Sequence, residues 1–204
     1  KITILIMISV VVPTFNRAKK LDLAIHSILN QQIESLEIIV IDDGSFDNTK
    51  QTILAFNNPQ IKYIKNNNNK GTTLSRVLGL KKARGEYVAF LDDDDIWIEN
   101  KLSQQLDCLL SKNVDFVLSN YIVNDTTIDK KYKKNLFSYE KKFALNIVCL
   151  PGPFLQCCLF KRSLLIENLV LFDSRAEPSE DWDFFIGLSK LNPKVAIIND
   201  VLFQ

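Results

Sequence analysis

Residues 83–95 read ARGEYVAFLDDDD, and this stretch places four consecutive aspartates directly after an apolar run. The run over residues 87–91 has the length and composition of a buried strand, so the acidic residues are expected to begin where that strand ends. Carboxylates packed together repel one another unless a cation neutralises them, and a hard divalent cation prefers such oxygen ligands. The alternative is an acidic start to the next helix, which accounts for one or two aspartates but not four.

Strand and helix signals alternate through the first half of the chain. Continuous apolar runs predict buried strands over residues 4–12, 38–41, 61–64, 87–91 and 116–118. Apolar residues at helical spacing predict helices over residues 18–32, 72–83 and 99–110, with a shorter helix that includes Ile53 and Leu54. Strands separated by helices imply right-handed crossovers, and therefore an α/β fold with a mainly parallel sheet.

Polar residues follow three of these strands at the point where each strand ends. In an open parallel sheet, ligands bind outside the carboxyl ends of the strands, so these residues are expected to share one edge and form one site. The residues concerned are Pro13, Thr14, Phe15 and Asn16 after the first strand, Asp42 and Asp43 after the second, and Asp92 to Asp95 after the fourth.

Several of these residue types suit a nucleotide, and each also has a structural explanation. A carboxylate at Asp42 or Asp43 can accept hydrogen bonds from a base or a ribose, but the same Asp-Gly-Ser sequence also makes a good turn and helix cap. Phe15 can stack on a base or belong to the core. Arg76 can reach a base or a phosphate, or lie exposed on its helix.

The second half of the chain is less regular. Residues 120–142 are polar and lysine-rich, which predicts a loop followed by a helix. A strand is expected over residues 156–160, a helix over 180–190 and another strand over 195–198. Asp181 lies in the first turn of that helix, where a carboxylate can act as a general base and Trp182 can stack on a sugar. The alternative is an acidic first turn with a core tryptophan.

Composition argues against several classes of protein. The formal net charge of +1 gives no field that would attract nucleic acid. His26 is the single histidine and lies off the apolar stripe of its helix, which argues against a Ser-His-Asp or Cys-His hydrolase. P-loop and dinucleotide-binding glycine motifs are absent, and the four cysteines form no CxxC pair. Residues 1–12 are interpreted as a first strand and not as a signal peptide.

Taken in order, these motifs resemble the family 2 glycosyltransferases of the GT-A fold. The resemblance rests on residues 9–17 (SVVVPTFNR), residues 37–45 (EIIVIDDGS), residues 69–71 (NKG) before the helix that carries Arg76, residues 83–95, and the pair Glu180-Asp181. It implies a Rossmann-like, mixed and mainly parallel sheet flanked by helices. It also implies a single domain over residues 1–204, with a nucleotide-binding half at about 1–119 and an acceptor and catalytic half at about 120–204.

The resemblance also implies roles for individual residues. Phe15 and Asp43 would lie against the nucleoside base with Arg76 nearby, and Asp181 would be the catalytic base. Asp94 would contact Mn²⁺ or Mg²⁺ directly, with Asp92 as the other metal position. The whole expected set that binds the nucleotide-sugar is Pro13, Thr14, Phe15, Asn16, Asp42, Asp43, Arg76, Asp92 and Asp93.

Members of the family usually take UDP-sugars and invert configuration at the anomeric carbon. The resemblance therefore predicts a glycan or lipid-linked acceptor in bacterial surface glycan assembly. The sequence offers neither a transmembrane span nor a disulfide framework, so we expect the protein in the cytoplasm or peripherally at the inner face of the membrane. Residues 75–79 (SRVLG) depart from the family's more usual Ala-Arg-Asn-x-Gly, and many relatives continue beyond the equivalent of Gln204. A catalytically silent nucleotide-sugar-binding domain and a sugar-1-phosphate nucleotidyltransferase remain as alternatives.

Overall fold

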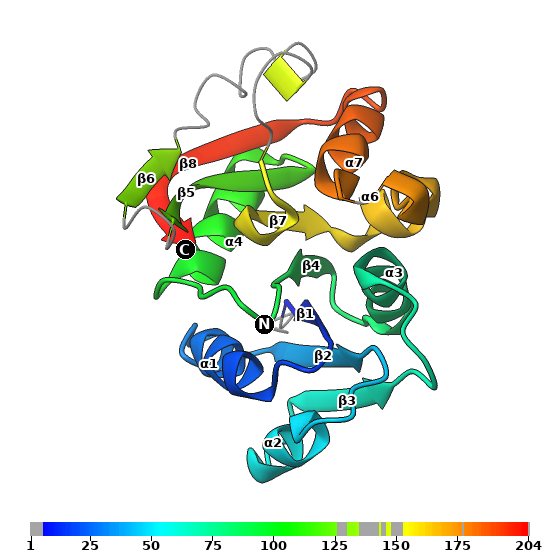
Figure 1. The fold of residues 1–204 in the computed structure, drawn as a ribbon. Coiled ribbons are helices and arrows are strands. Elements are labelled where there is room, and N and C mark those ends of the chain that lie inside the picture. The colour runs from blue at the N-terminus through cyan, green and yellow to red at the C-terminus, as the bar shows by residue number, and fades with distance from the viewer. Residues whose placement is uncertain are drawn as a thin grey trace.

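The structure is a computed structural model that describes residues 6–125, 130–134, 143, 146–147, 153–176 and 178–203. An eight-stranded sheet runs through the molecule in the order β3-β2-β1-β4-β7-β5-β6, with β8 paired to β5 (Figure 1). Helices pack on it, so the predicted α/β fold with a mixed sheet flanked by helices is confirmed. No helix in the described part of the chain is long and apolar enough to cross a bilayer.

The first half of the sheet is parallel. It contains β1 (Ile8–Thr14), β2 (Leu36–Asp42), β3 (Ile61–Lys65) and β4 (Tyr87–Phe90), and the connecting helices are α1 (Ala18–Leu29), α2 (Thr49–Ala55) and α3 (Thr72–Lys82). The residues of β1, β2 and β4 are all buried, as their unbroken apolar runs predict. Right-handed crossovers place α1 and α2 on one face and α3, which returns across the sheet, on the other.

The second half of the sheet contains both antiparallel and parallel strand pairs. Its strands are β5 (Phe116–Asp125), β6 (Lys130–Lys134), β7 (Cys158–Lys161) and β8 (Val195–Phe203), and its longer helices are α4 (Lys101–Lys112) and α7 (Glu180–Ser189). β7 lies between β4 and β5 and is antiparallel to both, whereas β8 is parallel to β5. Strand patterns do not reveal this order, because antiparallel and parallel buried strands have the same apolar run.

The prediction of a loop with a following helix over residues 120–142 is wrong for its first part. β5 continues to Asp125 and pairs antiparallel with β6. Lysines are common on edge strands, where they discourage pairing with other chains, and their polarity hides the strand from a search for apolar runs. Residues 135–142 lie outside the described part of the chain, so the helix expected there is untested.

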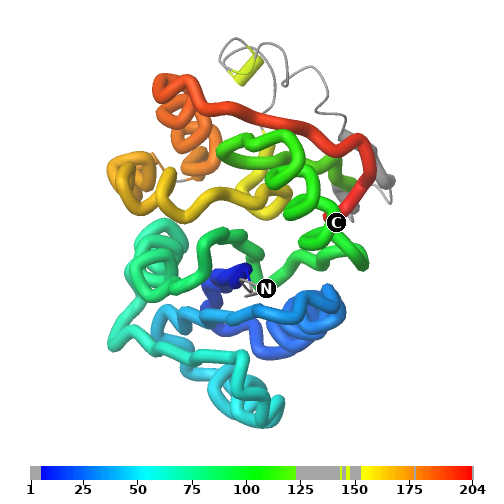
Figure 2. The backbone as a smooth tube through the Cα atoms, turned by 180° about the vertical axis from the view of Figure 1, so that it is seen from behind, coloured from blue at the N-terminus to red at the C-terminus, as the bar shows by residue number. Residues whose placement is uncertain are grey.

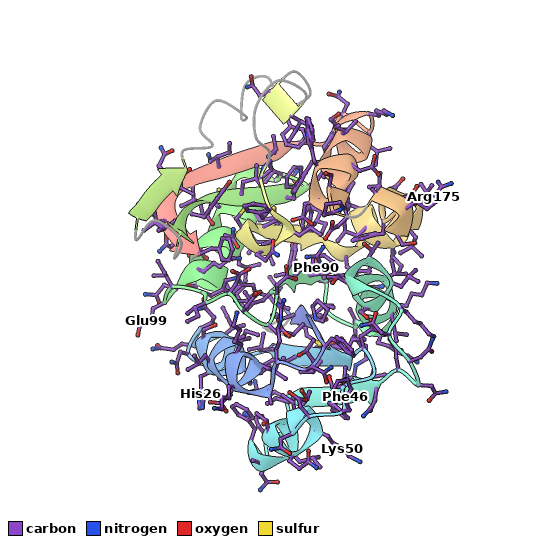
Figure 3. The ribbon with its side chains drawn as sticks, viewed as in Figure 1. His26, Phe46, Lys50, Phe90, Glu99 and Arg175 are labelled. Atoms are coloured by element: carbon purple, nitrogen blue, oxygen red, sulfur yellow. The ribbon has the colours of Figure 1, made fainter. Side chains whose placement is uncertain are left out.

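Aromatic side chains fill the interior beneath the second half of the sheet. Phe90 of β4 lies inside the molecule, as Figure 3 shows, and its ring contacts that of Phe160. Phe160 in turn packs edge-to-face on Phe184, a buried residue of α7. This packing fixes the position of α7 and of the acidic residues in its first turn. His26, by contrast, lies exposed on α1, as expected (Figure 3).

The second half also contains shorter elements, among them η3 (Leu169–Leu171) and η4 (Ser174–Ala176). The 3₁₀ turn η2 (Leu155–Cys157) leads into β7, and α6 (Arg162–Ile166) follows β7 and packs beside α3, as Figures 1 and 2 both show. Cys157 and Cys158 are buried, and Cys108 is partly buried. Cys157 and Cys158 therefore pack in the core as small, largely apolar side chains.

Candidate active site

The carboxyl ends of β1, β2 and β4 meet at one edge of the sheet and surround a cleft of about 360 Å³. We call it the first cleft. Seven of the residues predicted to bind a nucleotide or metal line it: Pro13, Thr14, Phe15, Asp43, Asp92, Asp93 and Asp94. The structure therefore brings together residues that are up to 81 positions apart in the sequence, as the rule for open sheets requires.

Asp93 and Asp94 differ in their surroundings. The hydroxyl of Thr14 donates to Asp93 Oδ2 over 2.6 Å, and Arg17 Nη1 donates to Asp93 Oδ1 over 3.1 Å. Burial raises the pKa of Asp93, and these two partners oppose the rise. Asp94 is one-third exposed, and its cationic partners Arg17 (2.9 Å) and Lys20 (3.6 Å) are themselves exposed. Asp94 is thus the more available carboxylate for a ligand in the cleft.

The two aspartates after β2 also have separate roles. Asp42 is fully buried and accepts hydrogen bonds from the backbone N–H of Ser45 and from the hydroxyl of Tyr63. This is the turn-forming role that the sequence left open, and Asp42 does not line the first cleft. Asp43 does line it, and one of its oxygens accepts hydrogen bonds from the backbone N–H groups of Lys70 and Gly71, both at 2.8 Å.

The loop after β1 explains the positions of Phe15 and Asn16. Phe15 is 38% exposed in the first cleft, so the interpretation of this residue as core is wrong. Its ring packs edge-to-face against Phe46, whose side chain projects into solvent (Figure 3). Asn16 has a positive φ of 55°, and its side-chain oxygen accepts a hydrogen bond from the N–H of Phe46. Asn16 therefore joins two loops and does not line the first cleft.

Arg76 is a deeply buried cation at the boundary of the two halves of the chain. Its side chain is 2% exposed, and Nη2 donates to both oxygens of Asp92 at 2.8 Å. Nη1 donates to Asp181 Oδ1 over 3.0 Å and lies 3.8 Å from Glu180. Burial lowers the pKa of Arg76, but the three carboxylates outweigh it and the net shift is upward. The alternative of an exposed surface arginine is wrong, since this face of α3 packs against the sheet.

Asp181 brings the second half of the chain to the same cluster. Besides the bond from Arg76, its Oδ2 accepts a hydrogen bond from the backbone N–H of Leu155 over 3.1 Å. Burial raises the pKa of Asp181, Arg76 opposes the rise and Asp92 adds to it. The pair Glu180-Asp181 is therefore more than an acidic helix start. Trp182 is 46% exposed, so the alternative of a core tryptophan is also wrong.

A second cleft of about 730 Å³ adjoins the first. The two clefts share Asp92, Asp94 and Glu180 as lining residues, so they meet at the acidic residues. Asp181 lines the second cleft together with Asp95, Tyr121, Phe154, Gln156 and Trp182. Burial, followed by the charges of Asp92, Asp94 and Asp93, raises the pKa of Asp95 to about 8. Repulsion among the four aspartates is therefore only partly relieved by the cations nearby.

The carboxylates suit an incomplete metal site better than a closed one. Among the residues that the structure describes, no group of three or more His, Cys, Asp or Glu side chains is arranged to hold a metal ion. Asp94 offers partly exposed oxygens, whereas both oxygens of Asp92 already accept hydrogen bonds from Arg76. Oxygen ligands of this kind fit a hard divalent cation whose remaining ligands come from a bound molecule and water.

Some residues of the site were not predicted from the sequence. Arg17, which bridges Asp93 and Asp94, lies next to the predicted loop residues and could have been found by its charge and position. Gln156 donates from its amide to Asp92, and the N–H of Leu155 donates to Asp181. Nothing in the sequence points to these two, because their roles depend on β7 lying next to β4.

Comparison with known proteins gives a consistent result. The family model for glycosyl transferase family 2 matches residues 9–169. The chain is 39% identical over 127 residues to the UDP-Glc:alpha-D-GlcNAc-diphosphoundecaprenol beta-1,3-glucosyltransferase WfgD of Escherichia coli, an alignment that covers 62% of this chain and 50% of WfgD. The chain therefore spans about half the length of this relative.

Solved structures show the same fold. The S. aureus TarS 1–349 structure in complex with UDP superposes with a TM-score of 0.82 at 24% identity, covering 97% of this chain and 59% of the other. The mannosyltransferase PcManGT from Pyrobaculum calidifontis, in complex with GDP-Man and Mn²⁺, gives a TM-score of 0.71 at 19% identity. The alignment covers 98% of this chain and 57% of PcManGT. These similarities confirm the GT-A fold expected from the sequence. Together with the family match over residues 9–169, they establish that the chain belongs to glycosyl transferase family 2.

Proposed function

We propose that this chain transfers a sugar, with inversion, from a nucleotide-sugar to an acceptor hydroxyl, and that the donor is a UDP-sugar. The observation that carries the proposal is the junction of the two clefts. Asp94 lies in both, Asp181 lies in the second, and Arg76 connects Asp181 to Asp92. A donor in the first cleft and an acceptor in the second would meet beside a carboxylate that can take a proton.

The first cleft provides groups for each part of the donor. Phe15 offers a half-exposed ring to the base, and Asp43 offers a carboxylate held in place by backbone N–H groups. Asp94, with Asp92 beside it, would hold Mn²⁺ or Mg²⁺. That ion would stabilise the negative charge of the departing diphosphate, a contribution of several kcal/mol. In support, PcManGT is described with GDP-Man and Mn²⁺, and TarS with UDP.

Asp181 would act as the general base. The acceptor hydroxyl gives its proton to Asp181 as its oxygen forms a bond to the anomeric carbon of the donor sugar. The bond from that carbon to the diphosphate oxygen breaks in the same step, and the nucleoside diphosphate leaves as an anion. One displacement from the opposite face inverts configuration and needs no covalent intermediate on the protein. Burial raises the pKa of Asp181, which makes its carboxylate a stronger base.

The acceptor is proposed to be a glycan, attached to a lipid, in bacterial surface polysaccharide assembly. The name of WfgD describes transfer of glucose to an N-acetylglucosamine that is linked through diphosphate to undecaprenol. We place the reaction at the inner face of the membrane, with peripheral contact between the protein and lipid.

Two alternatives predict different behaviour. A catalytically silent domain would bind metal and UDP but transfer no sugar. A sugar-1-phosphate nucleotidyltransferase would need a glycine-rich loop with Arg and Lys residues after β1, and the loop here begins with Pro13, Thr14 and Phe15. The site favours the glycosyltransferase over both, because Asp181 adds a base to the nucleotide-binding edge of the sheet.

The test uses Asp181→Asn and the control Asp183→Asn, which removes an exposed carboxylate two residues along the same helix turn. Both variants and the wild type are assayed for transfer from UDP-glucose and UDP-N-acetylglucosamine to octyl N-acetylglucosaminide. We expect Asp181→Asn to lower turnover by about 10²–10⁴-fold, the usual contribution of a general base, without weakening UDP binding. Asp183→Asn should behave like the wild type. Normal turnover by Asp181→Asn would show that Asp181 is not the general base. The anomeric configuration of the product, determined by NMR, tests inversion.

A further inference from the structure

Two half-exposed aromatic side chains, Phe154 and Trp182, line the second cleft together with Asp181. Trp182 is 46% exposed and follows Asp181 directly in the chain. Phe154 is 41% exposed and precedes Leu155, whose N–H donates to Asp181 Oδ2. Both line the cleft. One aromatic residue is therefore adjacent in sequence to the proposed base, and the other is adjacent to the residue whose N–H binds that base.

Both rings are held in position without filling the cleft. The indole Nε1 of Trp182 donates to the backbone oxygen of Ile147 over 2.7 Å, which satisfies its only polar group. The ring of Phe154 packs edge-to-face on Tyr121 with centroids 5.3 Å apart. A ring that is already ordered loses little conformational entropy when it meets a ligand, so these two surfaces are pre-organised for binding.

Gln156 adds an unsatisfied polar group to the same wall. Gln156 is 4% exposed, and its Nε2 donates to Asp92 Oδ2. Exchanging the amide oxygen and nitrogen would place Oε1 against that carboxylate oxygen, so the amide orientation is fixed. In the described part of the structure, its Oε1 is one of three buried side-chain atoms with no hydrogen-bond partner. Leaving such an oxygen unpaired costs about 1–3 kcal/mol, and a ligand hydroxyl that reached it would recover that energy.

The charge of the cleft selects against an anion. Its lining includes five carboxyl groups but only two cationic side chains, Lys20 and Arg76. Arg76 already donates from Nη1 to Asp181 and from Nη2 to Asp92. A phosphate or diphosphate placed here would be repelled by these carboxyl groups, whereas a neutral ring with hydroxyl groups would not.

We propose that the second cleft binds one pyranose ring of the acceptor directly. The C–H faces of the ring, which carry partial positive charge, stack on Trp182 and Phe154, and a hydroxyl donates to Gln156 Oε1. The diphosphate and lipid of a lipid-linked acceptor lie outside this cleft. The inference rests on the proposed function for the identity of the reacting hydroxyl, but the binding of the sugar does not depend on turnover.

The test measures binding and kinetics separately. Octyl N-acetylglucosaminide is titrated into Asp181→Asn while tryptophan fluorescence is followed, because the other tryptophan, Trp97, is buried. The same glycoside is the acceptor in the transfer assay for Trp182→Leu, Phe154→Leu and the aromatic replacement Trp182→Phe. Leu110→Ala is the control, since Leu110 is also 46% exposed but lines neither cleft.

We expect saturable quenching by the glycoside, and a rise of at least about tenfold in acceptor KM for the two Leu variants, equivalent to about 1.4 kcal/mol. Trp182→Phe should restore most of the affinity, and UDP binding should be unchanged in all variants. Unchanged acceptor KM in both Leu variants would overturn the inference and leave the proposed function standing. Saturable binding of the glycoside without transfer of any sugar would support the inference and contradict the proposed function. If neither binding nor transfer is found, the inference fails.

Discussion

At the scale of single residues, the site depends on one buried cation. Arg76 satisfies Asp92 and Asp181 together, and these carboxylates belong to different halves of the chain. Removing one partner of a buried pair leaves the other charges without compensation, which is far more costly than losing a surface pair. The arginine is therefore expected to control both the stability of the fold and the geometry of the base.

Arg76→Met should lower the free energy of unfolding by about 3–5 kcal/mol, and it should reduce sugar transfer more than UDP binding. Arg84→Met is the control, because the Arg84 side chain is 68% exposed and its Nε lies 3.4 Å from Glu37 Oε2. We expect the control to change stability by less than about 1 kcal/mol. Urea denaturation of both variants provides the measurement. Equal, small effects would show that the buried cluster does not stabilise the protein.

Site residues that stand out by residue type and position could be predicted from the sequence. Those whose role depends on tertiary contacts could not. The acidic residues after β4 and the pair Glu180-Asp181 stand out by residue type and position, and the structure brings them together. Arg76 was identified, but its burial against Asp92 and Asp181 depends on which face of α3 meets the sheet. Gln156 was not identified at all, since its contact with Asp92 exists only after β7 has paired with β4.

At the scale of elements, Glu37 joins the parallel strands through polar contacts. It lies on β2 and accepts hydrogen bonds from Ser9 on β1, from Lys62 on β3 and from the N–H of Arg84 before β4. Burial raises the pKa of Glu37, but these hydrogen bonds outweigh it and lower the pKa from 4.5 to about 2. One carboxylate therefore holds several elements of the sheet together.

This pairing should make stability depend on pH. The folded-state pKa of Glu37 lies below its value of 4.5 in the unfolded chain, so its stabilisation is complete above about pH 4.5 and is lost as the pH falls toward 2. Glu37→Gln should cost on the order of 2 kcal/mol at neutral pH, because Lys62 is one-third exposed and its contribution is partly screened. The difference from the wild type should shrink between pH 4.5 and 2. A difference in unfolding free energy that does not vary with pH would contradict this assignment.

Helix α3 approaches the sheet so closely that one position has no room for a side chain. A Cβ atom at Gly79 would lie 2.2 Å from Cγ1 of Val11 in the middle of β1. We expect Gly79→Ala to destabilise the protein by about 1–3 kcal/mol, the usual cost of overpacking. Gly187→Ala is a milder control, because its Cβ would meet only the end of the Leu171 side chain at 2.8 Å. Thermal unfolding of the two variants provides the comparison. An equal loss of stability in both would contradict the close packing of α3 on the sheet.

At the scale of the whole molecule, the sequence predicted the first half of the sheet and only part of the second. β1 to β4 alternate with helices, so right-handed crossovers leave few arrangements and the predicted edge is present. The second half depends on long-range pairing, because β7 inserts between β4 and β5 and β8 returns beside β5. No local pattern encodes such insertions, and the lysine-rich β6 does not have the apolar run of a strand.

The two halves meet where the chemistry is proposed. The first half supplies Asp92 and Asp94, and the second supplies Asp181 on a helix fixed by the aromatic interior. Under the proposed function, a site assembled in this way would place donor and acceptor groups on different parts of one fold and orient the reacting atoms before they meet.

The proposed function depends on Asp94 holding a divalent cation that nucleotide binding requires. Calorimetric titration of UDP, GDP, CDP and dTDP, with and without Mn²⁺, on the wild type and on Asp94→Asn tests it most directly. We expect UDP to bind best, its binding to require Mn²⁺, and Asp94→Asn to abolish the metal-dependent part. Nucleotide binding that is the same without Mn²⁺, or the same in Asp94→Asn, would contradict it.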